Sequence, residues 1–338
     1  MRQPEYLSPT SIGLWQKDRQ EFYLYYLADH RPPRIAQNEP MAIGAAFDAY
    51  IKSYLHERLF GKGANPQFEF GTIFETQVEP QNRDWALRHG AHVFESYRRS
   101  GALADLLLDL SQAKGDPKFE MTIQGRVVHS GCVRGIPLLG KPDIWFVNSV
   151  GIIVVYDWKV NGYCSVKTTS PKKGYIKLYD AHVDKPSRNV NNPHKDTQLM
   201  LVDGIYINIG HFLEEIEKSW ADQTAIYSWL LGASVGSRFT VGIDQIVCQG
   251  SDTEYPYLRV AAHRCRVSSA YQEMLFALIW KIWSTIKQGP RAIFSDEGMP
   301  PEESIARCEV LDLVYKNYED DHPHSSWFNE MSRTHKNF

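Results

Sequence analysis

The sequence has few cysteines and places none of them in a pattern typical of zinc sites or disulfides. Five cysteines are scattered over 338 residues, and no two of them form a CxxC pair. This spacing excludes the usual cysteine-based zinc motifs and gives no disulfide framework. We therefore expect reduced thiols with mainly structural roles.

An excess of basic residues and a long apolar run are also absent. The 37 Lys and Arg are balanced by 40 Asp and Glu, a net charge of −3, so a nucleic-acid binder would need a local basic patch. No apolar run approaches the roughly 20 residues that span a bilayer. The opening stretch "MRQPEYLSPTS" lacks the apolar core of a signal peptide. We therefore expect a cytoplasmic protein without a membrane partner.

The apolar pattern changes from helical to alternating spacing near residue 113. It predicts one domain with N-terminal helices (1–112), a sheet core (113–265) and C-terminal helices (266–338). Helices are expected at about 8–27, 41–60, 84–110, 211–231 and 268–287, with Ser8 as an N-cap and Pro9 at the first helical position. An antiparallel meander is predicted for four segments, "KFEMTIQG", "RVVHSGCV", "KPDIWFVNS" and "GIIVVYDWKV".

A long polar segment, residues 160–210, interrupts the sheet core. It is rich in Lys, Asn, Ser and Pro, shows no clear period and is longer than an ordinary connection. Basic and aromatic residues suited to a phosphate backbone and to stacked single-stranded bases are Lys167, Lys172, Lys173, Tyr175 and Lys177, with Lys185, Arg188 and Lys195 further on. A disordered loop with no role in binding is the equal alternative.

The stretch "VVYDWKV" places two opposite charges at the end of an apolar strand. Side chains two apart share a strand face, so Asp157 and Lys159 point the same way. Asp143 lies on the preceding strand, and pairing of the two strands would bring the carboxylates together. Such carboxylates suit Mg²⁺ or Mn²⁺, and Lys159 could orient a metal-bound water and stabilise charge on a phosphate. The alternative is a hairpin with a surface ion pair.

The order of these residues resembles a known nuclease signature. "PD", thirteen residues and then "DWK" is similar to the PD-(D/E)xK motif. Gln223 and Tyr227, four apart on one helical face, resemble the Gln-x-x-x-Tyr motif of RecB-like exonucleases. "IGAAFDAYI" resembles the family's Gly-x-x-x-His segment, except that Asp48 stands where the histidine is expected. The resemblance runs from about Ser8 to Gly232 and extends to CRISPR-associated and phage exonucleases.

The resemblance implies an α/β, restriction-endonuclease-like fold, a mixed central sheet flanked by helices. It implies Mg²⁺- or Mn²⁺-dependent hydrolysis of DNA, as an exonuclease on linear or single-stranded ends, with a phage or prophage origin. The implied metal ligands are Asp48, Asp143, Asp157 and the carbonyl of Trp158, and the implied catalytic residues are Asp143, Asp157, Lys159, Gln223 and Tyr227. No iron–sulfur cluster is expected, because "KDRQEF" stands where the early cysteine would be and the late cysteines are not clustered.

The sequence leaves two questions open. The aspartate at position 48 also fits a nuclease-fold protein that binds DNA or a protein partner with little or no cleavage, and RNA is a further candidate substrate. Glu120, on "KFEMTIQG", could reach the metal site from a neighbouring strand. We interpret it as a solvated strand carboxylate, because Glu is seldom buried.

Overall fold

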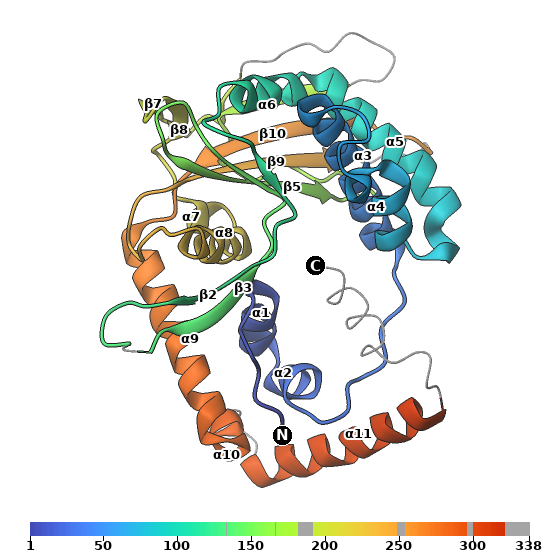
Figure 1. Cartoon of the computed structure of the whole chain (residues 1–338), viewed down its shortest axis with the longest axis vertical. Coiled ribbons are helices and arrows are strands. Elements are labelled where there is room, and N and C mark those ends of the chain that lie inside the picture. The colour runs from blue at the N-terminus through green and yellow to red at the C-terminus, as the bar shows by residue number, and fades with distance from the viewer. Residues whose placement is uncertain (133, 166, 182–191, 249–253, 296–299, 322–338) are drawn as a thin grey trace.

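A six-stranded mixed sheet forms the centre of the protein in a computed structural model that describes residues 1–132, 134–165, 167–181, 192–248, 254–295 and 300–321 (Figure 1). The strand order is β1-β4-β5-β9-β10-β6. β5 and β9 run parallel, whereas the other neighbours are antiparallel. The strands are β1 (Lys118–Phe119), β4 (Ile144–Val147), β5 (Ile153–Asn161), β6 (Lys177–Ala181), β9 (Thr240–Cys248) and β10 (Leu258–Cys265).

Helices cover both faces of this sheet (Figure 1). One face packs against α3 (Glu39–Phe60), α5 (Arg83–Ser100) and α6 (Ala102–Ser111), and the other against α1 (Pro9–Lys17), α8 (Lys218–Leu230) and α9 (Ser269–Gln288). Alternation along β9 explains the two cores: Val241 and Ile243 join the α8 side, and Ile246 joins the α5 side. The mixed α/β class and the flanking helices agree with the sequence-based expectation.

Smaller elements complete the fold. They are the helices α2 (Arg19–Tyr26), α4 (Phe70–Gln77), α7 (Leu213–Ile216), α10 (Pro290–Phe294) and α11 (Pro301–Asp321), the short 3-10 helices η1 (Pro66–Phe68) and η2 (Pro80–Asn82), and the hairpins β2 (Ile123–Val127) with β3 (Ile136–Gly140) and β7 (Leu199–Val202) with β8 (Ile205–Asn208). Among the described residues, no helix combines the length and apolarity needed to cross a membrane.

Two predicted helices are each divided by a single residue. Ser8 caps α1 and Pro9 begins it, as predicted. Asp18 then takes an extended conformation, ends α1 and caps α2 by accepting from the backbone N–H of Glu21 at 2.8 Å. Gly101, with φ 91°, separates α5 from α6 by a left-handed conformation and has no side chain to cap the second helix. The predicted helices at 8–27 and 84–110 are therefore pairs of helices.

The predicted four-stranded meander is wrong. β4 and β5 pair antiparallel as expected, but β2 and β3 form a separate hairpin outside the central sheet. The segment "RVVHSGCV" contributes only its first two residues to β2, and Ile136–Gly140 supplies the missing strand. Ile136 and Leu138 are buried in the α8–α9 core, and this tertiary packing outweighs the turn signal of the surrounding Pro and Gly.

The described parts of the polar segment 160–210 contain more regular structure than its composition predicts. β6 pairs with β10 at the sheet edge, because Tyr179 and Ala181 fill positions in the α5-side core. The hairpin β7–β8 follows. Lys185 and Arg188 lie outside the described residues.

Candidate active site

The sheet brings together the two aspartates of the PD and DxK segments. β4 and β5 pair in a register that places Ile144 opposite Tyr156, so Asp143 lies opposite Asp157. The turn between the strands is fixed by Asn148, whose Oδ1 accepts from the backbone N–H of Ile152 at 2.9 Å. Nζ of Lys159 lies 2.6 Å from Oδ2 of Asp157. The apolar half of β5 thus anchors a charged pair beside a second carboxylate.

Helix α8 supplies the next two predicted residues. Nζ of Lys159 donates to Oε1 of Gln223 at 3.0 Å, and Nε2 of Gln223 donates to the hydroxyl of Tyr227 at 2.9 Å. Gly140 permits this approach, because a Cβ there would lie 2.6 Å from the Tyr227 ring. Burial raises the pKa of Tyr227 to about 12, so its hydroxyl stays protonated. A chain of two polar side chains, Gln223 and Tyr227, therefore holds the ammonium of Lys159 in place.

Lys52 is a residue of this site that the sequence analysis missed. Its side chain is 1% exposed, and Nζ lies 2.5 Å from Oδ2 of Asp48 and 3.0 Å from Oδ1 of Asp143, with a further contact to Glu120. Asp48 and Lys52 are four apart on α3, a spacing that was a readable signal of an ion pair. The ammonium thus lies among three carboxylates.

The interpretation of Glu120 as a solvated carboxylate is wrong. Its side chain is 19% exposed and contacts the ammonium groups of Lys52 and Lys141. Its backbone N–H donates to the carbonyl of Asp143 at 3.1 Å, which extends the pairing of β1 with β4. With φ at 50°, Glu120 has the left-handed conformation that non-glycine residues seldom adopt. Such conformations cluster at functional sites.

The carboxylates of the site have unequal proton affinities. Burial raises the pKa of Asp48 to about 7, although Lys52 opposes the shift. Burial and the neighbouring Asp143 raise the pKa of Asp157 well above its usual value. For Asp143, burial is outweighed by Lys52 and by the other charges and hydrogen bonds of the site, which hold its pKa below the usual range. Two adjacent buried carboxylates cannot both ionise cheaply without a cation.

Asp157 also has an atom that is buried and incompletely paired. Its side chain is 4% exposed, and among the described residues Oδ2 accepts no hydrogen bond. The 2.6 Å approach of Lys159 is an ion pair whose direction does not suit a hydrogen bond. Buried polar atoms without partners are uncommon and favour an additional ligand.

Carboxylate oxygens of Asp48, Glu120 and Asp143 could hold a metal ion, since they lie within 4.8 Å of one another. This donor set is the one that hard divalent cations such as Mg²⁺ prefer. The three carboxylates include Asp48 and Asp143, which the sequence predicts as ligands, and Glu120, which is an addition. The ammonium of Lys52 would have to move for an ion to contact all three. Asp157 lies beside this group, opposite Asp143. The Trp158 carbonyl stays a predicted ligand.

A cleft of about 820 Å³ opens beside the acidic group. Its walls come from α3, α4, η1 and β1, and Glu120 and Lys141 stand on its lining. Three phenylalanines, Phe60, Phe68 and Phe119, make aromatic contacts within it. The cleft therefore leads from an aromatic surface to the carboxylates.

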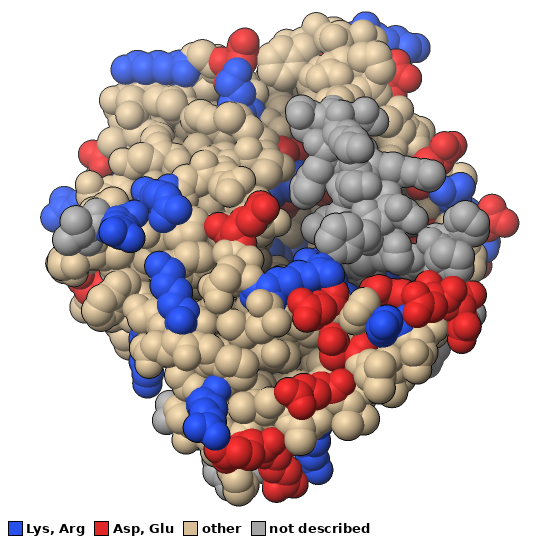
Figure 2. Space-filling model, turned by 60° about the horizontal axis from the view of Figure 1, so that its bottom comes forward, with Lys and Arg blue, Asp and Glu red and all other residues tan. Residues whose placement is uncertain are grey.

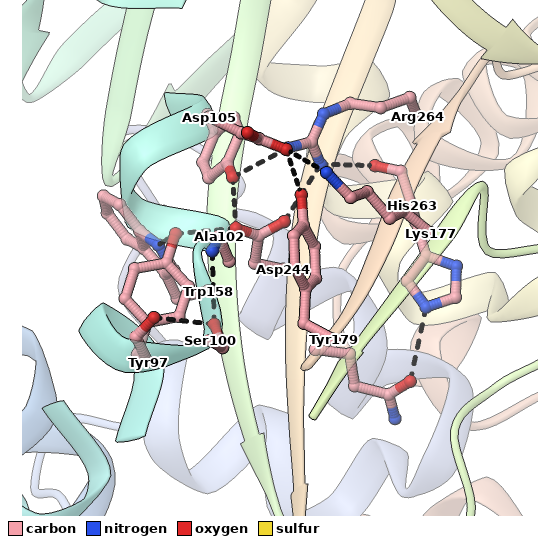
Figure 3. A network of polar contacts seen from close by, with 12 residues as sticks. Tyr97, Ser100, Ala102, Asp105, Trp158, Lys177, Tyr179, Asp244, His263 and Arg264 are labelled. Atoms are coloured by element: carbon pink, nitrogen blue, oxygen red, sulfur yellow. Dashed lines mark hydrogen bonds and ion pairs between the residues drawn. The ribbon is translucent and has the colours of Figure 1, made fainter. Parts of the chain in front are cut away.

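The predicted nucleic-acid contacts of the basic insertion include two lysines that form ion pairs within the protein, of which Lys172 is itself exposed. Lys177 contacts Asp105 at 2.7 Å and lies over the ring of Tyr179 (Figure 3), and Lys172 contacts Glu217 at 2.8 Å. Lys167 and Lys173 are exposed, and Tyr175 is half-buried. On the face shown in Figure 2, many acidic side chains gather at the lower right, and the basic side chains on the left lie apart from one another.

Comparisons with known proteins give little further information. No family model matches the chain, and no curated protein matches it. One solved structure, "Crystal structure of SSO0001", is 11% identical, with 84% of this chain and 93% of that chain covered and a TM-score of 0.25. A likeness this weak identifies neither the fold family nor the function.

Proposed function

We propose that the protein is a RecB-like nuclease that hydrolyses DNA phosphodiester bonds with Mg²⁺ or Mn²⁺, on a restriction-endonuclease-like fold. The observation that carries the proposal is Lys159, which contacts Asp157 at 2.6 Å and Gln223 at 3.0 Å beside Asp143. These contacts bring Lys159 together with Asp143, Asp157 and Gln223 at one place, which supports the proposal. Exonuclease action on DNA ends, and a phage or prophage origin, rest on the resemblance.

The residues divide into metal-binding and positioning groups. Asp48, Glu120, Asp143 and Asp157 would hold the ion, which supplies a water of lowered pKa and stabilises charge on the phosphate when bound. Lys159 is placed to orient the attacking water and to stabilise the developing negative charge. Gln223 and Tyr227 keep Lys159 in that position.

The cleft supports a nucleic acid as the substrate. Aromatic side chains on its wall can stack against unpaired bases, which is how many proteins hold single strands. Lys141, on the lining beside Glu120, can contact a phosphate. A single-stranded end would reach the carboxylates with its bases against Phe60, Phe68 and Phe119.

The test is cleavage of labelled linear and circular DNA with Mg²⁺ or Mn²⁺, with labelled RNA as a third substrate. Wild type and Asp222→Asn, which alters a carboxylate of α8 that accepts from Tyr271, should cleave linear DNA, whereas Asp157→Asn should not. No cleavage by the wild type with either metal would overturn the enzyme assignment. Cleavage of circles would identify an endonuclease.

A second candidate function is supported by Lys52. A buried ammonium that already contacts three carboxylates can replace the metal and leave a nuclease fold that only binds DNA or a protein. The variant Lys52→Met tests whether the ammonium occupies the place of the ion. If Lys52 replaces the metal, the variant should gain Mn²⁺ affinity of at least about tenfold, since a like charge is removed. If instead Lys52 only supports the fold, the variant should lose stability and gain no affinity. Titration of Mn²⁺, followed by its electron paramagnetic resonance signal, distinguishes these results.

A further inference from the structure

A second group of metal-binding side chains lies at the base of the β7–β8 hairpin, away from the carboxylates described above. His194, Asp196 and His211 each offer one ligand atom, and these atoms lie within 4.8 Å of one another. His194 and Asp196 precede β7, and His211 follows β8. We infer that these three side chains bind a transition-metal ion of the Zn²⁺ type, which joins the two ends of the hairpin.

The orientation of His211 is the first observation in support. Nδ1 of His211 lies 3.5 Å from Oε2 of Glu215, and that carboxylate is itself fixed by the backbone N–H of Phe212 at 3.0 Å. A carboxylate at one ring nitrogen orients the other nitrogen toward a metal in many zinc sites. Nε2 of His211 is buried and has no hydrogen-bond partner among the described residues. It is therefore the nitrogen available to an ion.

The backbone brings the two ligand-bearing segments into close contact. Ile209 donates from its backbone N–H to the carbonyl of Gln198 at 2.8 Å, one step beyond the β7–β8 pairing. A Cβ on Gly210 would lie 2.8 Å from the carbonyl oxygen of Asp196. Only glycine lets the chain that carries His211 pass this close to Asp196. The approach of the ligands is thus built into the backbone.

The other segment is held equally firmly. The backbone N–H of His194 donates to the carbonyl of Tyr175 at 3.0 Å, and the hydroxyl of Thr197 donates to the same carbonyl at 3.0 Å. The backbone N–H of Thr197 closes a turn on His194 at 2.8 Å. The rings of His194 and His211 lie 6.5 Å apart, centre to centre. Rotation of side chains on a fixed backbone can therefore bring the ligands together.

The types of ligand atom favour zinc over magnesium. Two imidazoles and one carboxylate suit Zn²⁺ and similar ions, whereas Mg²⁺ prefers oxygen alone. Ligand atoms around one tetrahedral Zn²⁺ lie about 3.3–3.5 Å apart, and those of this group lie within 4.8 Å of one another, so they would approach by at most about 1.4 Å. With three protein ligands, a water molecule would complete the coordination.

The hairpin has a physical need for such a link. A two-stranded hairpin is marginally stable on its own, and β7 buries little, with Leu199, Met200 and Leu201 all exposed. A metal that closes the base of the hairpin would restrain both ends, in the way that metals stabilise small elements with little core. Zinc binding at this place is independent of DNA cleavage, and the inference does not rest on the function proposed above.

The experiment measures bound zinc in the full chain after chelation, reloading with Zn²⁺ and dialysis, by elemental analysis. His211→Gln and Asp196→Asn remove ligands, and Asp196 is 55% exposed, so the second variant should fold normally. His129→Gln is the matched control, because His129 also contacts a carboxylate, that of Glu273, far from the group in sequence. Asp157→Asn alters the proposed catalytic site alone.

We expect one more zinc ion per chain in wild type and His129→Gln than in His211→Gln and Asp196→Asn. Co²⁺ should give visible absorption bands of a low-coordinate, histidine-ligated site in wild type, His129→Gln and Asp157→Asn and not in His211→Gln and Asp196→Asn. Chelation should also speed proteolysis within residues 192–210 of the wild type. Equal zinc content in wild type and in both ligand variants would overturn the inference.

Discussion

Two buried ionic clusters lie on opposite faces of β5 and differ in how completely their charges are paired. On the α5 side, Asp244 accepts from the hydroxyl of Tyr97 at 2.6 Å and from that of Tyr156 at 2.5 Å, and contacts Arg264 at 3.0 Å (Figure 3). Burial raises the pKa of both tyrosines well above 10, so they remain neutral donors. Every partner of this aspartate stabilises its charged form.

On the α8 side, Asp157 has a different environment. It lies beside a second carboxylate, Asp143, and its Oδ2 accepts no hydrogen bond from the described residues. Side chains alternate along β5, so Tyr156 and Trp158 face the cluster around Asp244. Asp157 and Lys159 face the opposite side, where Asp143 lies. A fully paired buried charge is typical of structure, whereas an incompletely paired one beside a like charge indicates a ligand.

The largest expected effect is the loss of DNA cleavage in the Asp157→Asn variant. Loss of a metal-binding carboxylate should lower kcat/KM for linear DNA by at least about 100-fold, because metal stabilisation of the transition state is worth several kcal/mol. The melting temperature should change little, because Asp143 remains as a counter-ion for Lys159 after the charge of Asp157 is removed. The measurement pairs a nuclease assay with thermal unfolding in chelator. A marked loss of stability would place Asp157 with the structural cluster instead.

Asp244→Asn should have the reverse effect, a loss of stability with no change in metal binding. Removal of the charge leaves the buried guanidinium of Arg264 without its carboxylate, which costs about 3–5 kcal/mol in the free energy of unfolding. Urea denaturation measures that loss. At temperatures where the variant is folded, its affinity for Mn²⁺ should equal that of the wild type, and a loss of metal binding would contradict the distinction between the two clusters.

The pH dependence of stability should differ between the wild type and Asp48→Asn. The pKa of Asp48 is about 7 in the folded protein and 3.8 in the ordinary carboxyl, so the folded state holds this proton more tightly. The corresponding stabilisation is complete below about pH 4 and is lost as the pH rises through 7.

Urea denaturation in chelator, from pH 4 to 8, tests this prediction. The stability of the wild type relative to Asp48→Asn should fall across that range by up to about 4 kcal/mol. Parallel curves for the two proteins would show that Asp48 ionises normally. Asp116→Asn, at an exposed position, is the control.

Local periodicity was sufficient to predict one half of the candidate site. Alternation along a strand places Asp157 and Lys159 on one face, and helical spacing does the same for Gln223 and Tyr227. Pairing of neighbouring strands added Asp143. The structure brings these five residues together, with the metal-binding and catalytic roles still to be tested.

The other half depends on tertiary placement that periodicity does not encode. Lys52 reaches Asp143 only because α3 packs across the end of the sheet, and Glu120 reaches Lys52 only through its positive φ. The β2–β3 hairpin was missed for a related reason, since burial of Ile136 and Leu138 determines that strand. The sheet order of β6 likewise depends on packing by Tyr179, a residue in a segment of polar composition.

The smallest expected effect is that of Tyr227→Phe, which tests how far the arrangement around Lys159 extends. The hydroxyl of Tyr227 accepts from Gln223 at 2.9 Å, and Gln223 in turn accepts from Lys159. Loss of one hydrogen bond two steps from the reaction is worth about 1 kcal/mol, which corresponds to a decrease of about fivefold in kcat. KM should not change, since the hydroxyl touches no substrate. Tyr271→Phe is the matched control, because its hydroxyl also bonds a side chain of α8, that of Asp222, which precedes Gln223 in the chain but projects about 100° away from it around the helix. Equal rates for Tyr227→Phe and wild type would limit the functional group to Asp157, Lys159 and their direct contacts, and would leave Tyr227 with the structural residues of α8.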